Sequence, residues 1–170
     1  MKRPTITALL VAALLTVPAA VTAQHAPEPQ ARIEAPVSAG ALKLTRRIVR
    51  GVDVTGEDVA GYVRVRNDSP VADRLVRVTC ACADRVELHR IQRSGPTPGM
   101  AADPSWEAPG AGLLEVRPGS DLHFMLINYD PSRTEGGRVL MKLEFAGAGT
   151  VEADFVLVQD SRAAWDGFTE

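Results

Sequence analysis

Hydrophobic and polar residues alternate with a period of two along much of the chain beyond residue 40. In one run Val139, Met141, Leu143 and Phe145 fall on one face, while Lys142 and Glu144 fall on the other. This is the pattern of a strand with one buried face, and no segment shows a convincing amphipathic helical period. Runs of this type predict strands over residues 41–49, 61–66, 74–79, 85–92, 112–116, 122–128, 139–145 and 150–158.

Turn-forming residues separate these runs. Asn67-Asp68-Ser69-Pro70 and Arg117-Pro118-Gly119-Ser120 are turn sequences, and Gly136 and Gly137 supply backbone freedom before the next run. Short strands at this frequency, several with apolar residues on both faces, predict an all-β domain. Such strands build either a two-sheet sandwich or a closed Greek-key barrel.

The N-terminus has the features of an export signal. Lys2 and Arg3 precede an apolar stretch from Ile6 to about Ala20, and small residues then predict cleavage after Ala23. A retained membrane anchor is the less favoured alternative, because the stretch is short and Pro18 interrupts it. We therefore expect a periplasmic protein with a signal peptide over 1–23, a flexible leader over 24–40, a β-domain over 41–158 and a polar tail over 159–170, from which Trp165 and Phe168 could dock on the domain.

Charge and motifs narrow the function. Cleavage after Ala23 removes two positive charges and no acidic ones, so the formal net charge moves from −2 to −4. This balance argues against a nucleic-acid partner. The chain has no glycine-rich phosphate loop, HExxH or GxSxG motif. We therefore expect a protein that is not an enzyme.

Histidine and methionine are scarce beyond residue 23, and four of them form a spaced set. The order is His89, ten residues, Met100, twenty-two residues, His123, one residue, Met125. His123 and Met125 share a strand face, whereas Leu122, Phe124 and Leu126 point to the other face. Met100 lies in the Gly/Pro-rich segment 94–100, which could fold back over the strand ends.

Two imidazoles and two thioethers make a soft, neutral donor set that suits Cu(I). Zn(II) rarely uses methionine, and Mg(II) or Ca(II) prefers oxygen ligands. Taken singly, each of the four residues would be structural, as we expect for Met141 among its apolar strand neighbours. As a spaced set they predict a copper site, with Phe124 or Trp106 as candidate shielding residues.

The chain resembles the periplasmic copper chaperones of the PCu(A)C type, whose signature is H-x10-M-x21-H-x-M. The likeness runs from about Ala60 to Val158 and includes Arg85-Val86-Glu87-Leu88-His89, Val116-Arg117-Pro118-Gly119 and His123-Phe124-Met125-Leu126-Ile127. The resemblance implies a cupredoxin-like Greek-key β-sandwich or barrel of about eight strands, with His89, Met100, His123 and Met125 as the Cu(I) ligands. It also implies a copper-acceptor partner, such as the dinuclear copper subunit of cytochrome c oxidase or a thiol copper-assembly protein. We expect the chaperone itself to be a monomer.

Cys80 and Cys82 are the two cysteines of the chain. If residues 74–79 and 85–92 form a hairpin, His89 lies roughly 20 Å from its turn, too far for a shared ion. Packed or disulfide-bonded cysteines, a redox or second soft-metal site, and an intermolecular bond stay open. His25, second in the cleaved chain, is a candidate Cu(II) ligand with the new N-terminus or a surface residue.

Other functions remain as alternatives. A copper-storage or resistance protein would use the same four residues without a dedicated acceptor. A thiol-disulfide reductase built on Cys80 and Cys82 is disfavoured, because the pair is not a CxxC at a helix N-terminus. A structural exported sandwich would leave the four residues scattered in space, so their convergence discriminates between these classes.

Overall fold

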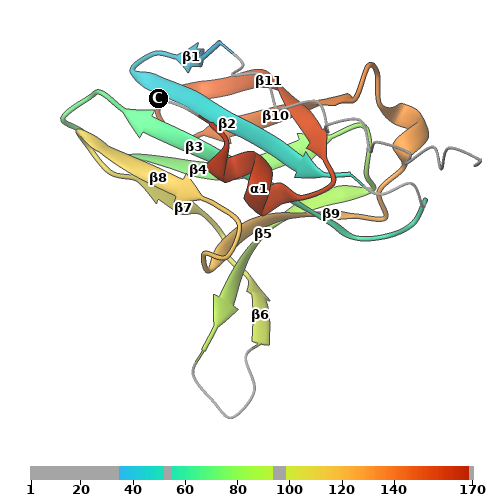
Figure 1. The fold of residues 1–170 in the computed structure, drawn as a ribbon. Helices are drawn as coiled ribbons and strands as arrows, with labels where there is room; N and C mark the ends of the chain where they lie inside the picture. Colours follow the sequence, from blue (N-terminus) through green and yellow to red (C-terminus); the bar gives the residue numbers. More distant parts are fainter. Residues whose placement is uncertain (1–34, 52–54, 94–98, 169–170) are drawn as a thin grey trace, which may run out of the picture.

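The computed structural model describes residues 35–51, 55–93 and 99–168, and more than half of them lie in strands (Figure 1). The all-β prediction is confirmed. The elements are β1 (Val37–Ala39), β2 (Leu42–Arg50), β3 (Val59–Asn67), β4 (Asp73–Cys80), β5 (Arg85–Gln92), β6 (Gly99–Ala102), β7 (Trp106–Ala108), β8 (Gly112–Val116), β9 (Leu122–Ile127), the 3-10 helix η1 (Pro131–Arg133), β10 (Arg138–Phe145), β11 (Gly149–Val158) and α1 (Ser161–Asp166).

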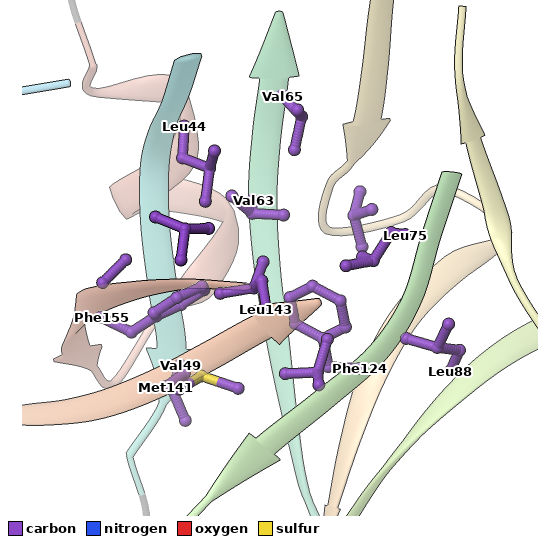
Figure 2. Packing of buried hydrophobic residues seen from close by; sticks show 14 of the residues in the cluster. Leu44, Val49, Val63, Val65, Leu75, Leu88, Phe124, Met141, Leu143 and Phe155 are labelled. Atoms are coloured by element: carbon purple, nitrogen blue, oxygen red, sulfur yellow. The ribbon is translucent and has the colours of Figure 1, made fainter. Parts of the chain in front are cut away.

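The strands form one continuous hydrogen-bonded path in the order β6-β5-β9-β3-β2-β11-β10-β4-β7, with β1 beside β2 and β8 beside β3. All pairs are antiparallel except β11 with β2, where Val156 lies opposite Ile48. The sheet curls, so side chains from β4 and β10 meet those of β3 and β9. In Figure 2, Leu75, Leu143, Val63 and Phe124 point into one shared interior. The curled sheet therefore encloses a single main core.

Alternation along β10 is as the sequence predicts. Val139, Met141, Leu143 and Phe145 are buried, and the residues between them face outward. Met141 is fully buried, in agreement with its expected core role. Trp106 stacks on Phe124 with ring centroids 5.5 Å apart, and Phe124 meets Phe155 edge-on at 6.2 Å. Strand β9 is thus fixed from the core side by an aromatic cluster.

Three short strands, the 3-10 helix η1 and the helix α1 were not predicted. Strand β6 begins within the Gly/Pro-rich segment and β7 follows it, and β1 lies within the predicted leader, where it pairs with β2. In the predicted loose tail, Asp160 caps α1 by accepting hydrogen bonds from the next backbone N–H groups. Trp165 and Phe168 are buried against Ile48, so these two side chains dock on the domain. The tail is therefore ordered through Phe168.

The hairpin expected from residues 74–79 and 85–92 is wrong. Strand β4 pairs with β10 and β7, whereas β5 pairs with β9 and β6. The chain crosses from one end of the sheet path to the other through a turn in which Cys80 and Cys82 are disulfide-bonded. Cys82 is almost fully buried.

The signal peptide, His25 and most of the leader lie outside the described residues. Within the described ranges no helix has the length and apolar character needed to cross a membrane.

Candidate metal centre

Three adjacent strands, β6, β5 and β9, carry the four predicted ligands at one edge of the sheet path. In Figure 1, β5 and β6 project together from the body of the domain, and β9 runs beside the base of β5. On the core side of these strands, Leu88, Phe124 and Leu126 are buried. The candidate ligands occupy the alternate positions, so they share the opposite face.

His89 and His123 are a directly opposed pair on β5 and β9. Their ring centroids are 5.6 Å apart, with the rings nearly perpendicular at 78°. This places two imidazoles side by side although thirty-three residues separate them in the sequence. The cross-strand register, rather than any local sequence feature, creates the pair.

Met125 follows His123 by two residues and lies opposite Glu87, one diagonal step from His89. Diagonal neighbours on one sheet face are about 7–8 Å apart at their Cα atoms, within reach of a long side chain. Met125 is partly buried. His89, His123 and Met125 therefore form a compact group, which we call the His-Met triad.

Met100 lies on the same face but further out. Met100 on β6 lies opposite Ile91 on β5. It is therefore a diagonal step from His89, on the side away from Met125, and it is 61% exposed. In a flat sheet this register separates the Cα atoms of Met100 and Met125 by roughly 16 Å. The structure thus brings three of the four predicted ligands together. The paired strands β5 and β6 would have to bend toward β9 to add Met100.

Burial sets the protonation of His123. The residue is only 7% exposed. Loss of solvent around its ring, and secondarily the neighbouring His89, hold the pKa of His123 below the ordinary histidine value. His123 is therefore neutral at neutral pH, the form that can donate a lone pair to a metal.

His89 has an unsatisfied ring nitrogen. Its Nε2 lies 2.7 Å from a carboxylate oxygen of Glu87, but its Nδ1 is buried and has no hydrogen-bond partner among the described residues. A buried nitrogen without a partner is costly in a folded protein. A bound metal ion would satisfy this nitrogen, so His89 fits a metal ligand.

The nitrogen and sulfur donors decide which cation fits. Among the described residues no group of three or more His, Cys, Asp and Glu side chains is placed to hold a metal ion without methionine. The triad instead offers two imidazoles and one thioether, with a second thioether nearby on Met100. Such a set favours Cu(I).

One sequence expectation about the surroundings is wrong. Phe124 and Trp106 do not shield the triad, because both point into the core from the other side of β9. Glu87 was not among the predicted site residues. The sequence feature that indicates it is the spacing Arg85-x-Glu87-x-His89, which places three polar side chains on one strand face.

Solved structures share the fold. The copper-bound PCuAC domain of PmoF2 superposes with a TM-score of 0.62 at 22% identity, covering 75% of this chain and all of that domain. The solution structure of apo-DR1885 from Deinococcus radiodurans gives a TM-score of 0.54 at 21% identity, covering 93% of this chain and 97% of that one. The Cu(I) form of DR1885 gives 0.52 at 19% identity, covering 78% and 85%. The cupredoxin-like β-fold is confirmed.

Curated proteins give no significant match. The family model described as "Putative lipoprotein LpqE-like" matches residues 30–157, which include every strand of the curled sheet except the last residue of β11. The chain therefore belongs to the LpqE-like family.

Proposed function

We propose that this protein is an exported copper chaperone that carries one Cu(I) ion on the His-Met triad. The observation that carries the proposal is the convergence of His89, His123 and Met125 on one face of β5 and β9. Structures of the same fold that are described as copper-bound and Cu(I)-bound support it. Copper is here the cargo rather than a resident cofactor.

The chemistry of the triad suits loading and release. His123 supplies an imidazole that is neutral at neutral pH, because burial lowers its pKa. One of its ring nitrogens therefore has a free lone pair for the metal. Met125 supplies a thioether, which carries no proton, so proton competition acts only through the histidines. Met100, exposed on β6, serves as the outermost ligand. A partner can then approach from the β6 edge and replace the ligands stepwise.

The acceptor is expected to be a copper subunit of cytochrome c oxidase or a thiol copper-assembly protein in the periplasm. Support comes from the PCu(A)C resemblance and from the N-terminal signal sequence. Storage or resistance without a dedicated acceptor would use the same site. Incubating the Cu(I)-loaded protein with a purified oxidase copper domain separates these functions. A chaperone should transfer Cu(I) to the domain faster than it releases free Cu(I) into solution. A storage protein should transfer Cu(I) no faster than it releases the free ion.

Competition with a chromophoric Cu(I) chelator tests the site itself. Met125→Ala should weaken Cu(I) binding by more than about tenfold, or ~1.4 kcal/mol. Met100→Ala should weaken it less, because Met100 lies outside the triad. Leu113→Ala on β8, also an exposed apolar side chain, is the control and should bind as the wild type does. Equal affinities in the wild type and Met125→Ala would contradict the proposal.

A further inference from the structure

A row of three polar side chains leads along β5 to the His-Met triad. Arg85, Glu87 and His89 alternate with Val86 and Leu88, so they lie on one face of the strand. Arg85 Nε donates to one carboxylate oxygen of Glu87, and the other oxygen lies 2.7 Å from His89 Nε2. Each oxygen of Glu87 therefore has its own partner.

The contact with Glu87 decides which nitrogen of His89 carries hydrogen. A glutamate carboxylate is ordinarily ionised at neutral pH, and the Arg85 guanidinium bound to Glu87 favours this charged form. An ionised carboxylate only accepts hydrogen bonds, and a neutral imidazole has one N–H. The 2.7 Å contact thus requires the hydrogen on Nε2, which leaves Nδ1 with a free lone pair.

The environment of Nδ1 completes the argument. It is buried and has no hydrogen-bond partner among the described residues, while His123 lies edge-on at 5.6 Å. Metal-binding histidines usually donate their second N–H to a carboxylate or carbonyl, which fixes the ring and its tautomer. Glu87 and His89 have this arrangement.

We propose that Glu87 is a positioning residue that holds His89 as the Nε2–H tautomer and thereby presents Nδ1 as the copper-binding atom. This inference rests on the proposed function. Glu87 is not itself a ligand, because its two oxygens are occupied by Arg85 and His89 and a hard carboxylate is a poor match for Cu(I).

The first test needs no metal. Long-range ¹H–¹⁵N correlation spectra of the ¹⁵N-labelled apoprotein at pH 8 report which nitrogen of each histidine is protonated. The wild type should show His89 with hydrogen on Nε2. In Glu87→Gln the single amide oxygen stays with Arg85, a pure donor, and the amide NH₂ faces Nε2, so the population should shift toward the Nδ1–H tautomer.

Two controls isolate the effect. Arg85→Ala removes a charged neighbour in the same row but leaves the carboxylate acceptor, so the Nε2–H tautomer should persist. Glu115→Gln alters another Arg–Glu pair of the sheet, in which Arg64 Nε on β3 donates to Glu115 on β8 over 2.7 Å. It should leave His89 unchanged. An unaltered His89 tautomer in Glu87→Gln would overturn the proposal.

The second test adds Cu(I). The wild-type spectrum should show Nδ1 of His89 metallated and Nε2 protonated, and Glu87→Gln should bind Cu(I) about 10–100-fold more weakly, with Glu115→Gln unaffected. Copper on Nε2, or equal affinities in the two Gln variants, would refute the role of Glu87. A wild-type protein that takes up no Cu(I) would instead refute the proposed function, and the apoprotein spectra would still decide the tautomer.

Discussion

Replacing Phe124 by leucine tests whether the aromatic core, rather than a copper shield, is the role of this residue. Phe124 is fully buried and contacts Trp106 and Phe155 at 5.5 and 6.2 Å between ring centroids. An aromatic pair contributes about 0.5–1.5 kcal/mol beyond area burial. Loss of both pairs should therefore lower the free energy of unfolding by roughly 1–3 kcal/mol.

Urea denaturation of the apoprotein measures this loss, with Leu140→Ala as the control. Leu140 is an exposed apolar side chain on β10, and such surface changes usually stay within about ±0.5 kcal/mol. Cu(I) affinity should be unchanged in Phe124→Leu, because the ring points away from the face that carries His123. A stability equal to that of Leu140→Ala, or a weakened Cu(I) affinity without loss of stability, would refute the reasoning.

Three further predictions concern stability and copper content. Because the pKa of His123 is lower in the folded protein than in the unfolded chain, the unfolded chain binds more protons as the pH falls below about 6.5. The urea midpoint of the apoprotein should therefore fall between pH 7 and pH 5.5, and a fall of the same size in His123→Gln would contradict this cause. Replacing Cys80 and Cys82 by alanine should leave one copper per chain by elemental analysis, since the disulfide lies outside β6, β5 and β9; a lower copper content would place the cysteines at the site. Asp160→Ala removes the cap of α1 and should cost about 1 kcal/mol in urea denaturation, whereas an unchanged midpoint would show that this cap contributes nothing to stability.

Much of the fold follows from local sequence. The alternation that buries Val139 and Leu143 is a property of β10 alone, and the shared face of His123 and Met125 needs only the two-residue period. The eight predicted runs all became strands. These features depend on neighbours in the chain, so periodicity was sufficient to predict them.

Other features depend on contacts between distant segments. Only a short turn separates β4 from β5, and such a turn favours a hairpin. The pairing of each strand, however, depends on where in the sheet its apolar face is buried. Strand β4 pairs with β10, whereas β5 pairs with β9. Helix α1 has only six residues and is held by the burial of Trp165 rather than by its own propensity. The tail therefore looked unstructured when its sequence was considered alone.

The candidate site divides in the same way. Residue types and the PCu(A)C resemblance gave His89 and His123, but only the register of β5 against β9 showed that they are directly opposed. The outward position of Met100 follows from the pairing of β6, in a segment whose Gly and Pro residues suggested a loop. The role of Glu87 required the hydrogen bond to His89, which no sequence period specifies.

X-ray absorption at the copper edge of the Cu(I)-loaded protein tests the central claim most directly. We predict a copper shell with two imidazole nitrogens and thioether sulfur, and Met125→Ala should remove one sulfur scatterer while both imidazoles remain. A shell without sulfur, or one that Met125→Ala leaves unchanged, would contradict the assignment of copper to His89, His123 and Met125.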